Sequence, residues 1–141
     1  MKTLKTFSTF LSTLPEAGSW EEDGGHPVGR KPLELLGRIF DALGFEATYF
    51  DQRDFYGWEL EVKKDKLKFV CVIQPDPDRA DDECSYLLQC KPEQGLLPFG
   101  RPHPSAWKDV LDEIYERFGT QTDIINFNPM TYEEFAAVEI A

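Results

Sequence analysis

The sequence predicts an α+β fold, in which helices from both ends of the chain pack on an antiparallel sheet of about four strands. Residues 46–90 contain consecutive segments with the two-residue period of strands, joined by short connections, and segments with helical spacing flank them. A chain of 141 residues, 41% hydrophobic and 13% aromatic, is long enough to bury one core. We therefore expect a single domain over residues 1–141, with the order α-α-β-β-β-β-α-(β)-α, the bracketed strand being short.

The N-terminal segment is expected to form an amphipathic helix over about residues 2–14. Its two lysines followed by apolar residues also resemble a secretory signal peptide, but serines and threonines interrupt the apolar run, so we favour the helix. The apolar positions have the three- and four-residue spacing of one helical face. These positions are Leu4, Phe7, Leu11 and Leu14.

The segment GGHPVGRKP, residues 24–32, contains glycines with the four-residue separation of a phosphate-binding P-loop. The match then fails, because Arg and Lys follow Gly29 where Lys and Ser or Thr are needed, and two prolines remove amide donors. We interpret the segment as the entry to a helix that begins at Pro32. Gly44 should end this helix as a left-handed cap, with Phe45 folded back on the last turn.

Four strands are expected next, at residues 46–50, 56–63, 67–74 and 85–90. The second alternates strictly between apolar and other residues, which is typical of a half-buried antiparallel strand. The third is almost continuously apolar and should therefore be central.

Both faces of the central strands are predicted to be apolar. Val70 and Val72 alternate with the other apolar residues of their strand, and Leu87 does the same on its neighbour. We expect the N-terminal helix to cover this second face; if it does not, a partner protein or a second copy must do so.

The C-terminal part predicts two helices with a strand between them. A helix over residues 105–118 has Ser105 as its N-cap, and a short strand follows at residues 123–127. Thr131 and Glu134 have the spacing of a capping box, which marks the start of the last helix.

The charge of the chain is strongly unbalanced, with a formal net charge of −11. Such a field repels nucleic acids and anionic membranes and attracts basic proteins, although acidic groups also serve solubility alone. We therefore expect no direct binding of nucleic acid and no membrane association. The acidic residues gather in three places, namely Asp76, Asp78, Asp81, Asp82 and Glu83; Glu21, Glu22 and Asp23; and Glu133, Glu134 and Glu139.

No metal or cofactor site is predicted. The three cysteines and two histidines lack the paired spacings of zinc sites, and an odd number of cysteines is typical of a reducing cytoplasm. The segment PDPDRADDE, residues 75–83, lacks the glycine of a calcium loop and has Ala80 at a ligand position.

These observations predict a non-enzymatic, cytoplasmic, acidic protein that binds a basic protein. The most concrete version is an inhibitor of the kind that bacterial immunity proteins represent, which neutralises a basic toxin or effector. The contact residues would be the first two acidic groups above, with three aromatic anchors near the second, apolar face of the sheet. These anchors are Trp20, Tyr56 and Trp58.

Two alternatives remain open. A secretion-type chaperone would hold a client, or a second copy in a homodimer, on the apolar sheet face. A small enzyme of unknown reaction would draw on Cys90 and His103.

Overall fold

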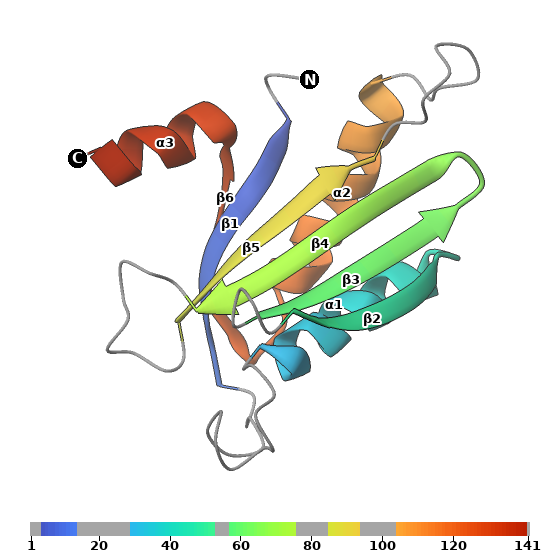
Figure 1. The fold of residues 1–141 in the computed structure, drawn as a ribbon, viewed down its shortest axis with the longest axis horizontal. Coiled ribbons are helices and arrows are strands. Elements are labelled where there is room, and N and C mark those ends of the chain that lie inside the picture. Colours follow the sequence, from blue (N-terminus) through green and yellow to red (C-terminus); the bar gives the residue numbers. More distant parts are fainter. Residues whose placement is uncertain (1–3, 14–28, 53–56, 76–84, 94–103, 141) are drawn as a thin grey trace.

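The computed structural model describes residues 4–13, 29–52, 57–75, 85–93 and 104–140. Over these residues the fold is α+β, with one six-stranded antiparallel sheet and three helices (Figure 1). The strands lie in the order β2-β3-β4-β5-β1-β6. The elements in chain order are β1 (Lys5–Ser12), α1 (Arg30–Ala42), β2 (Glu46–Gln52), β3 (Gly57–Lys64), β4 (Leu67–Pro75), β5 (Ser85–Pro92), α2 (Pro104–Gly119), β6 (Ile124–Thr131) and α3 (Tyr132–Ile140).

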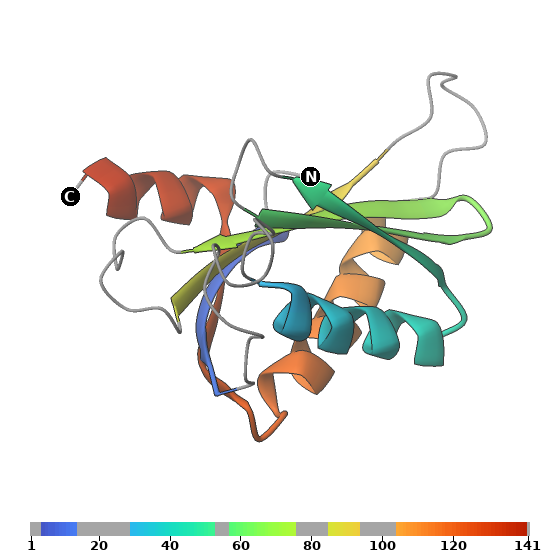
Figure 2. The same cartoon turned by 60° about the horizontal axis from the view of Figure 1, so that its bottom comes forward.

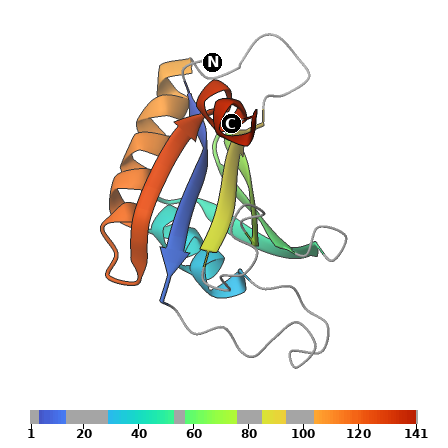
Figure 3. The same ribbon diagram turned by 90° about the vertical axis from the view of Figure 1, so that its left-hand side faces the viewer.

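The predicted N-terminal helix is wrong, because this segment forms β1 between β5 and β6 (Figure 3). Along β1, Ser8, Phe10 and Ser12 are buried, whereas Phe7 and Leu11 are only partly buried. This two-residue alternation matches a strand, and Thr and Phe favour that conformation. The helical spacing of the leucines is therefore coincidental, and pairing with two neighbouring strands decides the structure.

The predicted strand count and element order also need correction. The four strands expected between residues 46 and 90 are present as β2 to β5, but β1 and β6 extend the sheet to six. The short strand expected at residues 123–127 is the eight-residue β6, which pairs with β1. The order over the described residues is β-α-β-β-β-β-α-β-α.

Helices α1 and α2 cover one face of the sheet, which we call the inner face, and α3 lies on the opposite, outer face (Figure 2). Large apolar side chains of both layers form the core between them. The largest fully buried ones include Trp107, Tyr86, Phe40, Phe69 and Phe118. None of the helices within the described residues has both the length and the apolar content required to cross a bilayer.

The end of α1 confirms the predicted glycine cap. Gly44 has a φ of 93°, its N–H donates to the carbonyl of Asp41 at 2.9 Å, and the Phe45 N–H donates to that of Phe40 at 3.1 Å. The rings of Phe40 and Phe45 meet edge to face with centroids 5.2 Å apart. These are the hydrogen bonds and the apolar contact of a Schellman motif, which turns the chain directly into β2.

Helix α2 begins at Pro104, one residue before the predicted N-cap Ser105. Its Trp107 ring packs edge to face on Phe69 of β4, with centroids 5.1 Å apart. The hydroxyl of Tyr115 donates a 2.5 Å hydrogen bond to the carbonyl of Lys5. Helix α2 is thus joined both to the centre of the sheet and to the start of β1.

Helix α3 begins with the predicted capping box. The Glu134 N–H donates to the Thr131 hydroxyl at 3.2 Å, and the Thr131 N–H donates to Glu134 Oε1 at 3.0 Å. Phe135 stacks on Phe7 with centroids 4.5 Å apart, and Tyr132 also contacts this ring. Helix α3 therefore covers the outer face only at one end of β1.

Candidate functional site

Among the predicted contact residues, only Trp58 belongs to the described part of the chain. It is 8% exposed and its register partner on β4 is Ile73, a core residue, so it lies on the inner face. The prediction that Trp58 flanks the second face of the sheet is therefore wrong for its position. The other predicted contact residues lie outside the described residues, and they are Asp76, Asp78, Asp81, Asp82, Glu83, Glu21, Glu22, Asp23, Trp20 and Tyr56.

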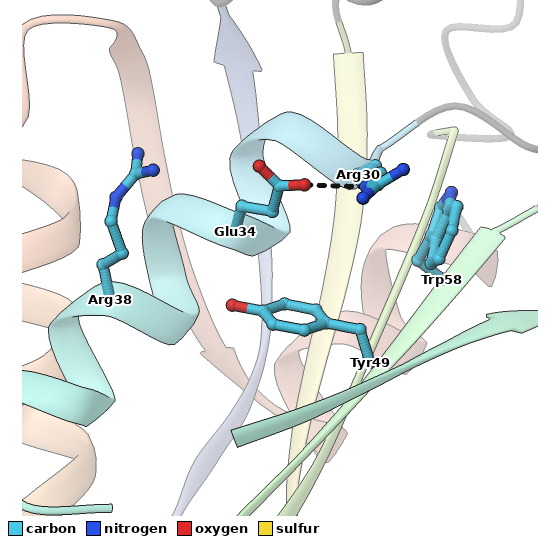
Figure 4. Close-up of a pocket in the computed structure, with 5 residues that line it drawn as sticks. All are labelled: Arg30, Glu34, Arg38, Tyr49 and Trp58. Atoms are coloured by element: carbon cyan, nitrogen blue, oxygen red, sulfur yellow. Dashed lines mark hydrogen bonds and ion pairs between the residues drawn. The ribbon is translucent and has the colours of Figure 1, made fainter. Parts of the chain in front are cut away.

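Trp58 belongs instead to a cavity of about 460 Å³ between α1 and the inner side of β2 and β3 (Figure 4). Three charged side chains from successive turns of α1 form one wall. Two aromatic rings from the strands form the floor. The lining residues are Arg30, Glu34, Arg38, Tyr49 and Trp58.

The arginine at the start of α1 is held in place by two contacts. Arg30 Nε lies 2.7 Å from Glu34 Oε1, and the guanidinium carbon lies 5.3 Å from the centre of the Trp58 ring. The second contact is a cation–π interaction, which favours a cation over the ring face. Arg38, two turns further along α1, makes no ion pair with the residues that the structure describes.

The Tyr49 ring lies against the middle of α1, and a glycine makes this possible. A Cβ added at Gly37 would lie 1.9 Å from the Tyr49 hydroxyl oxygen, so no larger residue fits without moving the ring. Burial raises the pKa of Tyr49, and the charge of Glu34 raises it further. Sequence reasoning missed this pair, although a glycine inside an amphipathic helix is a signal of close packing.

The start of α1 tests the interpretation of GGHPVGRKP as a helix entry. Helix α1 begins at Arg30, two residues before the predicted start, and Gly29 precedes it with a φ of 107°. A Cβ at Gly29 would lie 3.0 Å from Ile73 Cγ2, so the helix entry packs closely on β4. Residues 29–32 form the helix entry, as predicted, and Gly29 serves the backbone conformation and this contact. Residues 24–28 lie outside the described residues.

The described residues offer no assembled reactive group. Cys71 and Cys90 are 0% exposed and face each other on β4 and β5, so neither thiol can reach a substrate. Burial raises the pKa of Cys71 well above its usual value, and a hydrogen bond with Cys90 acts in the same direction. No group of three or more His, Cys, Asp or Glu among these residues could hold a metal ion.

The outer face carries a second concentration of charge. Glu59 and Glu61 lie on β3, and Glu93 follows β5. Lys68 Nζ lies 3.7 Å from Glu61 and 3.4 Å from Glu93. Burial raises the pKa of Glu59, and the charges of Glu61 and Glu93 raise it further. Lys68 thus pairs with two of these three carboxylates, and Lys63 and Lys91 lie on the same face as the register partners of Lys68 and Val70.

Apolar side chains lie directly beside these carboxylates. Val70 and Val72 are partly buried and are the register partners of Glu61 and Glu59. Leu87 lies on the same face and is 8% exposed. Val70, Val72 and Leu87 lie on the outer face as predicted, but this face is not apolar throughout, because Glu59, Glu61 and Lys68 share it. Its predicted cover, the N-terminal helix, is wrong, since that segment forms β1.

Comparison of the chain with models of protein families, with curated proteins and with solved structures finds no match.

Proposed function

We propose that this protein is a non-enzymatic module that binds a basic protein, and that it acts as an immunity-type inhibitor of a toxin or effector. The observation that carries the proposal is the outer face, where Lys68 pairs with Glu61 and Glu93, and Glu59 lies two positions from Glu61 along β3, beside the partly exposed Val70 and Val72. A surface of this kind combines charge for attraction with apolar area for contact.

A cationic side chain from the partner would offset the unfavourable electrostatic environment of Glu59. The raised pKa of Glu59 means that its negative charge is disfavoured by burial and by its acidic neighbours. A lysine or arginine placed beside Glu59 supplies the missing positive charge. The ion pairs of Lys68 are partly exposed and therefore contribute little to stability, so a partner can displace them at small cost.

The rest of the molecule adds to the same field. Ten of the 26 acidic residues lie outside the described residues, and eight of these ten are the acidic contacts predicted from the sequence. The proposal includes these residues as contacts. It also includes action in the cytoplasm, without a cofactor, and with no direct binding to nucleic acid or membranes.

The chaperone alternative has one observation in its favour, which is the apolar area around Val70, Val72 and Leu87 on the outer face. A client held by apolar burial would stay bound as salt is raised, because salt screens charges and does not weaken apolar contact. An acidic inhibitor would release its partner under the same conditions. The salt dependence of binding therefore separates the two functions.

The proposal is tested by two double variants that change the net charge equally. Glu59→Gln with Glu61→Gln removes two charges from the outer face, and Asp109→Asn with Glu116→Gln removes two exposed charges from α2. Binding of a basic folded protein captured at low salt is measured by titration calorimetry at several salt concentrations. We expect the outer-face variant to bind roughly tenfold more weakly with a shallower salt dependence, and the α2 variant to bind nearly as the wild type. Equal losses in both variants, or binding that salt leaves unchanged, would contradict the proposal.

A further inference from the structure

The sheet has two edge strands, and they differ in how open they are. Strand β2 forms one edge and β6 the other. Residues 46–50 of β2 are all exposed, including Tyr49 at 38% and Phe50 at 40%. An edge strand presents unpaired backbone N–H and C=O groups, which are a template for another strand.

Strand β6 carries several of the features by which proteins protect an edge. Its pairing with β1 is interrupted by two register shifts, between Lys5 and Phe7 and between Thr9 and Leu11. Asn126 has a φ of 56°, and Pro129 has no N–H to donate. Bulges and prolines of this kind prevent a further strand from pairing along the edge.

Strand β2 has none of these features. It pairs with β3 in an unbroken register over all seven residues, from Glu46 to Gln52, and its sequence, EATYFDQ, contains no proline and no lysine. No strand among the described residues pairs with its other side. Strand β2 is therefore regular, exposed and able to accept a strand along its length.

We propose that an extended, basic segment of the partner adds to the sheet as a strand beside β2. This inference rests on the proposed function, since it names how the basic partner binds. Backbone hydrogen bonds to β2 would supply affinity, and alternate side chains of the added strand would supply specificity.

The charges around β2 determine the chemistry of the added strand. Its outer-face side chains would neighbour Glu46 and Phe50, and Phe50 pairs with Glu59 on β3. Strands lie about 4.8 Å apart, so Glu59 and Glu61 would be about 10 Å from the added backbone, and a lysine side chain that extends across β2 would bring its charge within the Debye length of about 8 Å. Lys63, the register partner of Glu46, is the opposing positive charge on this part of the outer face. Its inner-face side chains would neighbour Tyr49, which also lines the cavity of Figure 4. A strand with basic residues on one face and apolar residues on the other fits both sides.

A second copy of this chain fits less well. Each copy carries a net charge of −11, so association of two copies works against their mutual repulsion. A basic segment is attracted by the same charge. Charge complementarity therefore selects the basic partner as the occupant of the β2 edge.

The test uses two synthetic octapeptides, one of alternating lysine and valine and one of alternating glutamate and valine. Both have the same length and strand propensity and differ in the sign of their charge. Hydrogen exchange of the full chain, measured by NMR, reports which amides each peptide protects. We expect the lysine peptide to protect alternate amides of β2, because every second N–H of an edge strand points outward, and the glutamate peptide to protect none.

Two variants with nearly equal exposure locate the binding site. Phe50→Lys places a charge on the β2 edge, and Ile125→Lys places the same charge on the β6 edge, where Ile125 is 41% exposed. Both side chains lie on the outer face, because their register partners are Glu59 and Leu11. We expect Phe50→Lys to weaken binding of the lysine peptide at least about fivefold by repulsion and Ile125→Lys to change it less than about twofold.

Three results would overturn the inference. The first is that the lysine peptide fails to bind, and the second is that it binds but protects residues other than those of β2. The third is that the chain dimerises without peptide and that Phe50→Lys makes it monomeric, which would assign the edge to a second copy. In the first two cases the charge-removal test of the outer face still decides the proposed function. Failure of strand addition is thus distinguishable from failure of basic-protein binding.

Discussion

Cys71 and Cys90 show how a residue's surroundings determine its chemistry. Both side chains are 0% exposed, and they face each other from β4 and β5 in the centre of the core. Cysteine in a strand is usually a small buried apolar residue, so the expected strands predict this position, and the structure confirms it for both. The small-enzyme alternative requires that a substrate can reach Cys90, and the burial of Cys90 argues against this. His103, the other residue of that alternative, lies outside the described residues.

The buried thiols lead to a prediction about reactivity. Burial raises the pKa of Cys71, so the reactive thiolate is disfavoured in the folded state, and both thiols are closed to reagents. We expect iodoacetamide at about pH 8 to leave Cys71 and Cys90 unmodified in the native protein and to modify both in urea. Mass spectrometry of the peptides assigns each site, including Cys84 outside the described residues. Rapid native labelling of Cys90 would contradict the burial and reopen the enzyme alternative.

The cavity residues were predictable only in part. Arg30 follows Gly29 in the segment GGHPVGRKP, and Trp58 is one of the predicted contact residues. Neither position indicates that the two side chains meet, because they lie on different elements and are brought together by the packing of α1 on β3. Gly37 and Tyr49 meet for the same reason.

At the scale of single elements, local signals predicted structure well where they were strong. The glycine cap of α1 and the capping box of α3 involve residues within one turn of each other, so the neighbouring sequence is enough to specify them. Strand β1 has no such local marker. Its apolar residues fit a helix and a strand equally, and the choice depends on β5 and β6.

The capping box of α3 predicts a local, pH-dependent stability. Hydrogen bonds to the backbone N–H and to the side chain of Thr131 lower the pKa of Glu134 below its value in the unfolded chain. The stabilisation is therefore present above the unfolded pKa and is lost as the pH falls through the folded pKa. We expect amide protection in α3 to decrease below about pH 4 in the wild type.

Removal of the Thr131 hydroxyl should imitate this loss at neutral pH. An N-cap threonine replaced by alanine costs about 1 kcal/mol, and we expect Thr131→Ala to destabilise α3 by this amount, measured by hydrogen exchange. Thr122→Ala, at an exposed position before β6, is the matched control and should leave α3 unchanged. Equal rates of amide hydrogen exchange in α3 for Thr131→Ala and Thr122→Ala would argue against a capping role of Thr131.

At the scale of the whole molecule, β1 joins the two halves of the sheet. It pairs with β5 on one side and β6 on the other, so the first strand of the chain connects the β2–β5 meander to the C-terminal strand. Phe10 of β1 is 3% exposed and contacts Tyr86, Phe118 and Phe127, which belong to three other elements. The stability of the whole fold should therefore depend on the inner face of β1.

Two phenylalanines of β1 test this architecture. We expect Phe10→Ala to lower the free energy of unfolding by about 3–5 kcal/mol, because it empties a site in the core. Phe7→Ala, on the outer face beneath α3, should cost less, about 1–2 kcal/mol. Urea denaturation followed by circular dichroism measures both. A larger loss of unfolding free energy for Phe7→Ala than for Phe10→Ala would contradict the strand and fit the helical prediction, in which Phe7 belongs to the buried face.

Local sequence patterns and composition were enough to predict the class of the fold, the strands β2 to β5, the helices α1 and α2, the caps of α1 and α3, and the large negative charge. Each of these depends on residues close together in the chain or on composition alone. The folded molecule was needed to show that the N-terminal segment is a strand, that β2 is the open edge, and that Arg30, Tyr49 and Trp58 share a cavity. These features depend on contacts between distant segments, where the free energy of pairing and burial outweighs the weak local preference of each segment.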